Sequence, residues 1–90
     1  LSERQQVIAW RQRAANAGHV EAAYRLGLSY MDGHGVAVDL IEAYAWLNLA
    51  AAKGQVEAIA KREILARQLT REQLARAHDL SRQRLNDENT

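Results

Sequence analysis

The run AWRQRAANAGHVEA at residues 9–22 returns as AWLNLAAAKGQVEA at residues 45–58. Both runs carry Ala-Trp, then Ala-Ala, then Gly, and both end on Val-Glu-Ala. The offset is a constant 36 residues, from Trp10 to Trp46 and from Gly18 to Gly54. Alanines alone would coincide by chance between two helices, but a Trp and a Gly would not also fall at the same offset. A period of this size is typical of helix–turn–helix repeats.

Capping and turn residues divide the chain into about five helices. Ser2, Asp39 and Thr70 can cap helix starts, and each has Gln or Glu three residues later as a capping-box partner. Gly33 and Gly35 allow a loop with positive φ between the second and third helices. The expected helices span residues 2–17, 19–32, 39–53, 56–68 and 70–84, and residues 86–90 are expected to form a frayed tail.

The apolar residues indicate which helices are central. In the second helix, one apolar face holds Ala22, Ala23, Leu26, Gly27 and Tyr30, and the opposite face holds Tyr24, Leu28 and Met31. The third helix is apolar nearly all round, which predicts a central position. The fifth has a single apolar stripe, which predicts a C-terminal cap. We therefore expect an all-α fold of antiparallel helices, in which small residues such as Gly27 permit close helix contact.

Composition excludes several classes of function. The formal net charge is +1, so no strong field selects nucleic acid, and the basic residues near the C-terminus are interleaved with acids and lack aromatic neighbours. The absence of Cys excludes disulfides and thiolate metal sites. His19, His34 and His78 lack the spacing of a helix-borne zinc site. No nucleophile motif and no apolar stretch long enough to span a bilayer is present. We expect no catalysis, metal, cofactor, nucleic acid or membrane insertion.

The run from Ala22 to Asp39 and its continuation to Gly54 resembles a Sel1-like repeat, a relative of the tetratricopeptide repeat. The elements that carry the resemblance are Leu-Gly-x-x-Tyr, Gly-x-Gly-Val, the Asp that caps the next helix, Ala-x-x-Trp and Ala-Ala-x-x-Gly. In this sequence they are Leu26, Gly27, Tyr30, Gly33, Gly35, Asp39, Trp46 and Gly54, with Trp10 and Gly18 in the preceding half-repeat. The resemblance implies an α-α superhelix, or solenoid, within a bacterial protein.

The resemblance also divides the chain. Residues 1–85 are expected to form one domain. Within it, residues 1–18 are the second half of a repeat, residues 19–54 a complete repeat, and residues 55–85 a degenerate repeat with the cap. The compartment stays open between bacterial cytoplasm and periplasm, since the chain has no Cys and no visible signal peptide.

In a solenoid of this kind, the first helix of each repeat lines a concave surface. By that analogy, the residues that would contact a partner are Glu21, Tyr24, Arg25, Leu28, Met31, Asp32, Lys61 and Ile64. The alternative is that Tyr24, Leu28 and Met31 pack inside the same chain.

The leading hypothesis for function is a non-catalytic adaptor or scaffold that binds a segment of another protein on this surface. Two alternatives stand beside it. The first is a structural segment that self-associates, because Val7, Ile8 and Trp10 lack a preceding helix that would cover them. The second is an accessory domain of an enzyme.

Overall fold

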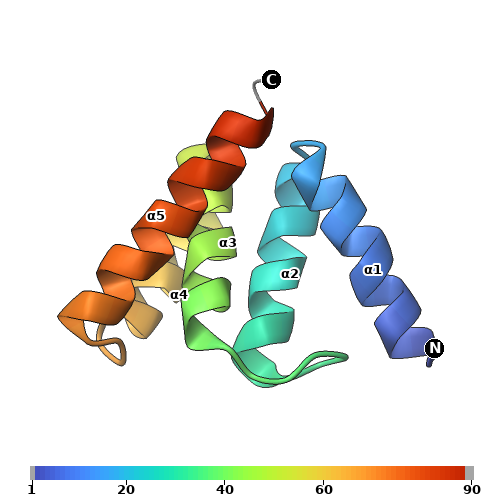
Figure 1. Cartoon of the computed structure of the whole chain (residues 1–90), viewed down its shortest axis with the longest axis horizontal. Helices are drawn as coiled ribbons and strands as arrows, with labels where there is room; N and C mark the ends of the chain where they lie inside the picture. The colour runs from blue at the N-terminus through green and yellow to red at the C-terminus, as the bar shows by residue number, and fades with distance from the viewer. Residues whose placement is uncertain (1, 89–90) are drawn as a thin grey trace.

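The computed structural model describes residues 2–88, and every regular element within them is an α-helix (Figure 1). The helices are α1 (Glu3–Asn16), α2 (Val20–Asp32), α3 (Leu40–Ala52), α4 (Val56–Ala66) and α5 (Arg71–Glu88). The expectation of an all-α fold with five helices is confirmed. The last helix continues to residue 88, beyond the predicted end near residue 84, so residues 86–88 are helical and not a tail. Residues 89–90 of the expected tail lie outside the described residues.

Two helix starts have the capping boxes that the sequence predicts. The Ser2 hydroxyl accepts from the Gln5 backbone N–H at 3.2 Å, and the Gln5 side chain accepts from the Ser2 N–H at 3.1 Å. Thr70 and Gln73 make the same reciprocal pair ahead of α5, at 3.1 and 2.8 Å. Each box satisfies two N–H groups that have no partner inside the helix.

The cap of α3 is only half of a capping box. The Asp39 carboxylate accepts from the Glu42 N–H at 3.1 Å, as predicted. The Glu42 side chain does not return to the Asp39 N–H, which instead donates to the Tyr30 carbonyl at 3.0 Å. Glu42 is therefore free to bond elsewhere, and its carboxylate bonds to a distant helix.

The Ala-Ala-x-x-Gly element of each repeat forms the same helix end. After α1, the His19 N–H donates to the Ala14 carbonyl at 3.1 Å, and the Gly18 N–H donates to the Ala15 carbonyl at 3.0 Å. After α3, the equivalent bonds join residue 55 to residue 50 and residue 54 to residue 51, each at 3.0 Å. Both ends are Schellman motifs, which need positive φ at the glycine. Gly18 has φ 93° and Gly54 has φ 97°.

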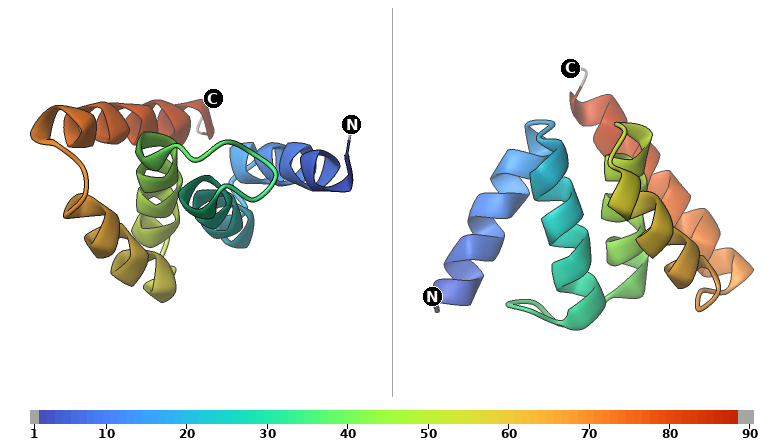
Figure 2. Two further views of the ribbon diagram at one scale, coloured as in Figure 1. Left: turned by 90° about the horizontal axis from the view of Figure 1, so that it is seen from below. Right: turned by 180° about the vertical axis from the view of Figure 1, so that it is seen from behind.

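The core forms around α3, which packs against α2, α4 and α5 (Figure 1). Seven of its 13 residues are buried, among them Trp46, Leu47 and Leu49. The prediction that the third helix is central is confirmed. In the view from below, α4 and α5 lie on different sides of α3 (Figure 2, left).

Gly27 sets how closely α2 approaches α3. A Cβ atom built on Gly27 would stand 2.8 Å from Leu47 Cγ and 3.3 Å from the Ala43 carbonyl oxygen. The first distance is shorter than real Cβ contacts allow, so any side chain at this position would push the two helices apart. The glycine therefore permits the tight contact that buries Leu26 and Leu47 completely.

An ion pair joins α5 to α3, and the pattern of the sequence does not predict it. Arg84 Nη2 donates to both oxygens of the Glu42 carboxylate, at 2.8 and 2.7 Å. The same guanidinium lies over the Trp46 ring, 4.2 Å from its centroid, in cation–π geometry. Asn48 adds a second link, since its amide donates to the Ser81 hydroxyl at 2.9 Å. The cap therefore rests on α3 through polar contacts as well as through the buried Ala77.

We predict that Gly27→Ala destabilises the fold by about 1–3 kcal/mol, because overpacking at Leu47 has this typical cost. The sign of the stability change is diagnostic, since Gly→Ala in an unobstructed helix interior raises the free energy of unfolding by roughly 1 kcal/mol. Urea unfolding followed by far-UV circular dichroism measures the change. The control is the same substitution in a Leu47→Ala background, where the Leu47 obstruction is gone and only the Ala43 carbonyl oxygen stays close, so Gly27→Ala is expected to destabilise the protein less. Equal destabilisation in both backgrounds would contradict this packing account.

Candidate functional site

The residues predicted to contact a partner lie on α2 and α4 but differ in exposure. Glu21, Arg25 and Asp32 are exposed on α2, whereas Tyr24 and Met31 are half-buried and pack against the core. Leu28 is half-buried and lies outside the set of side chains packed against the core. On α4, Lys61 is half-buried and Ile64 retains 43% of its surface exposed.

Glu21 links the start of α2 to the start of α4, which are the first helices of the two repeats. Its carboxylate accepts from Arg25 Nε at 2.9 Å, one turn along α2. It also accepts from Gln55 Nε2 at 3.0 Å, and Gln55 is the N-cap of α4. The two helices that the repeat pattern assigns to one surface are therefore joined at their N-terminal ends. Both bonds are exposed, so their main effect is on orientation and little on stability.

Ser29 is a polar residue of α2 that the structure buries. Its hydroxyl donates to the Arg25 carbonyl at 3.0 Å and accepts from Arg11 Nη1 at 3.4 Å. A serine in mid-helix can satisfy its hydroxyl on the preceding turn in this way, and so tolerates burial. The sequence position gives no sign that Arg11 of α1 covers it.

A hydrogen bond joins α1 to α2 near the Glu42 carboxylate of α3. Gln12 Nε2 of α1 donates to the Tyr30 hydroxyl of α2 at 3.2 Å. Burial, to which the nearby Glu42 carboxylate adds, raises the pKa of the Tyr30 hydroxyl above its ordinary value. The phenol therefore stays protonated and neutral at physiological pH, as a structural hydrogen-bonding group.

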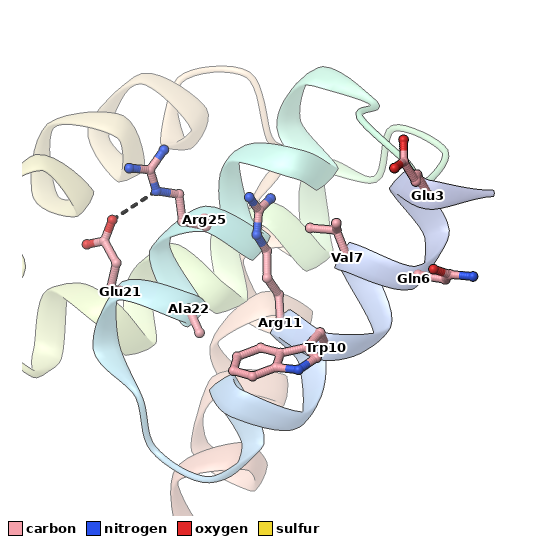
Figure 3. Close-up of a pocket in the computed structure, with 8 residues that line it drawn as sticks. All are labelled: Glu3, Gln6, Val7, Trp10, Arg11, Glu21, Ala22 and Arg25. Carbon is pink, nitrogen blue, oxygen red and sulfur yellow. Dashed lines mark hydrogen bonds and ion pairs between the residues drawn. The ribbon is translucent and has the colours of Figure 1, made fainter. Parts of the chain in front are cut away.

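An open groove lies between α1 and α2, and the sequence did not predict it. Its volume is ≈630 Å³, and its lining is mostly apolar (Figure 3). The lining residues are Glu3, Gln6, Val7, Trp10, Arg11, Glu21, Ala22 and Arg25. Figure 3 shows the Trp10 indole on α1 at one edge of the groove, with Arg11 beside it and the Glu21–Arg25 pair on α2.

The two repeat tryptophans differ sharply in exposure. Trp10 has 67% of its surface exposed, whereas Trp46 has 3%. The difference comes from their neighbours, because Trp46 is covered by Arg84 and packed in the core cluster. An exposed indole beside an apolar groove is a common feature of binding surfaces, where it supplies a large contact area.

Across residues 2–88, no group of three or more His, Asp and Glu side chains is placed to hold a metal ion. His19 and His34 are exposed, and His78 makes a T-shaped contact with Tyr44, with ring centroids 5.2 Å apart. In the same part of the chain, no helix is long and apolar enough to cross a membrane.

We predict that iodide quenches Trp10 fluorescence several-fold more strongly than Trp46 fluorescence in dilute solution. Two single-tryptophan variants separate the signals: Trp46→Phe retains Trp10, and Trp10→Phe retains Trp46. The retained Trp46 is expected to emit at shorter wavelength, because α5 shields its ring from water. Circular dichroism confirms that each variant is folded. Equal quenching of the two folded variants would mean that α5 does not cover Trp46.

Comparison with known proteins supports this architecture. The family model of the Sel1 repeat matches residues 20–55. No curated protein matches the chain. Among solved structures, the chain is similar to a protective antigen present in uropathogenic Escherichia coli strains that displays an SLR, or Sel1-like repeat, fold. The two share 32% sequence identity with a TM-score of 0.90, over 96% of this chain and 19% of the antigen.

The family match spans residues 20–55, and the shared fold extends over nearly the whole chain. Sel1-like repeat proteins are in general non-catalytic modules for protein interaction. Together, the family match and the likeness to a solved repeat structure show a Sel1 repeat at residues 20–55 within an all-α fold like that of Sel1-like repeat proteins.

Proposed function

We propose that this chain is an adaptor that holds a segment of another protein on the surface formed by α2 and α4. The observation that carries the proposal is the Glu21–Gln55 bond of 3.0 Å, which joins the N-terminal ends of these helices. Because this bond holds the two helices in one orientation at that end, a bound segment can contact both of them. A surface that is already ordered loses little conformational freedom on binding.

Exposure divides the candidate contact residues into two groups. Tyr24 and Met31 pack against the core, so they form the floor of the surface and their removal would also cost stability. Leu28 and Ile64 are the better anchors, because each offers apolar surface without joining that set of core-packed side chains. Leu28 belongs to the complete repeat, and Ile64 is its counterpart 36 residues later.

The charges on the surface suit a partner segment of mixed polarity. Arg25 is already paired with Glu21, so this edge is close to neutral. Lys61 and Asp32 remain to orient a partner that carries both signs of charge. Apolar anchors would supply most of the affinity, and the exposed charges would set the direction of the bound segment.

We expect the double variant Leu28→Ala/Ile64→Ala to lose its partner while remaining folded. Truncation of two central apolar contacts typically costs about 1–2 kcal/mol each, or roughly fivefold to thirtyfold weaker binding per residue. Affinity capture from a bacterial lysate, with mass spectrometry of the bound proteins, compares this variant with the wild type. Circular dichroism and urea unfolding establish that its helicity and stability are unchanged.

The matched control is Val38→Ala, which truncates an exposed apolar side chain in the loop before α3. Proteins that bind the wild type and the control, but not the double variant, would support the adaptor. If the double variant captured the same proteins as the wild type, the proposed surface would be wrong. Equal losses from all folded variants would point to nonspecific adhesion.

A further inference from the structure

The degenerate repeat has an arginine where the complete repeat has a core leucine. At the 36-residue offset, α1 corresponds to α3 and α4 corresponds to α2, so Arg62 of α4 occupies the position of Leu26. Leu26 is completely buried, and the spacing of Arg62 puts it on the same face of α4 as the completely buried Ala58 and Leu65. A guanidinium on such a face needs a hydrogen-bond acceptor, because an unpaired charge is costly to remove from water.

Asn48 of α3 supplies that acceptor and also reaches α5. Arg62 Nη1 donates to Asn48 Oδ1 at 2.9 Å, and Asn48 Nδ2 donates to the Ser81 hydroxyl at 2.9 Å. Because a guanidinium can only donate, the amide oxygen must face Arg62, which leaves the NH₂ group for Ser81. Ser81 is 5% exposed, so the α5 end of this connection is shielded from water. One amide therefore connects α4 to α5.

The same repeat position makes an equivalent link in the first half of the chain. Gln12 of α1, 36 residues before Asn48, donates to the Tyr30 hydroxyl of α2 at 3.2 Å. In both cases an amide on one helix holds the first helix of the following repeat. The link from Asn48 extends one helix farther, because its NH₂ group bonds to Ser81 of α5.

The helices α4 and α5 each pack against α3 and not extensively against each other (Figure 2). In the complete repeat, Gly27 of α2 permits close contact with α3, whereas Glu63 stands at the corresponding position of α4. A glutamate there does not allow the same close approach of a following helix. A change in the position of α5 is therefore transmitted to α4 through α3, and Asn48 is a residue of α3 that bonds to both.

Polar contacts hold α4 at two points along its length. The Glu21–Gln55 bond holds its N-terminal end beside α2, and Arg62 holds its second half against α3. The contact residues expected on α4, Lys61 and Ile64, lie one and two residues from Arg62. The orientation of these contact residues therefore depends on the second attachment.

We propose that the docked position of α5 controls the orientation of α4 through Asn48, and so regulates the α4 half of the adaptor surface. When Ser81 holds the Asn48 amide, the amide holds Arg62, and α4 is kept in its binding orientation. Displacement of α5 releases this attachment and loosens the surface around Ile64. Asn48 and Arg62 are thus positioning residues, and their role in binding rests on the proposed adaptor function.

A substitution on α5 tests this coupling when it is compared in two backgrounds. Ser81→Ala is expected to speed the amide hydrogen exchange of α4 several-fold and to shift the Ile64 methyl resonances, although Ser81 lies on another helix. In an Arg62→Leu background, where the connection is cut, adding Ser81→Ala is expected to change neither measurement. Arg62→Leu places on α4 the residue that α2 carries at the same repeat position, so this variant is expected to remain folded.

His78→Ala is the matched control, because it removes another contact of α5 with α3 and retains the Asn48 bonds. That contact joins His78 Nε2 to the Tyr44 hydroxyl at 3.4 Å. The control is expected to leave α4 exchange at the wild-type rate, and unchanged exchange of α2 in every variant excludes a general loss of stability. The proposal is overturned if Ser81→Ala leaves α4 unchanged, or if it affects α4 equally in the Arg62→Leu background.

The exchange measurements separate this proposal from the adaptor function, because they need no partner. If the wild type captures no specific protein, the adaptor function fails, while the coupling of α5 to α4 stands or falls on the exchange rates. For a protein that the wild type does capture, Ser81→Ala is expected to recover several-fold less than His78→Ala. Equal recovery by the two folded variants would mean that the coupling does not regulate binding.

Discussion

The close contact between Gly27 and Leu47 determines how the rest of the molecule is arranged. Because no side chain separates α2 from α3 at this point, Leu26 and Leu47 are completely buried, and α3 becomes the helix on which its neighbours pack. The loop between the two helices is equally constrained. Gly35, at φ 81°, lies so close to α1 that a Cβ atom would stand 2.9 Å from Ile8 Cγ1. Two glycines thus fix one helix pair and its position against the preceding helix.

The contacts that hold α5 in place differ from those that position α1 to α4. The repeat period positions α1 to α4 through apolar contacts and identical helix ends, whereas α5 is held on α3 by Arg84 between Glu42 and Trp46. This ion pair is largely shielded from water, so it contributes more than an exposed pair would. Its consequence for function is geometric, because an α5 placed on α3 leaves one face of α4 uncovered. The position in which α5 caps α3 therefore leaves Val56 and Ile59 of α4 exposed.

Much of the fold could be predicted because the residues that determine each helix boundary lie close to it in the sequence. Capping residues, glycines and the 36-residue period act within a few residues or within one repeat, and the observed helices follow them. The length and position of α5 could not be predicted in this way. Its partner Glu42 lies 42 residues from Arg84, and in sequence Glu42 has the pattern of a capping-box residue. The site was predicted less well for the same reason. Trp10 and Trp46 occupy the same repeat position, yet their exposure depends on which helix covers each.

One packing register, set by the contact of Gly27 with Leu47, determines how the helices and their exposed surfaces are arranged. Nuclear Overhauser spectroscopy between the Gly27 α-protons and the Leu47 methyl groups tests that register most directly. The account predicts a strong intramolecular cross-peak, since these atoms are in van der Waals contact across α2 and α3. A folded, helical protein without this cross-peak would contradict the register, and with it the correspondence of α1 to α3 and of α4 to α2.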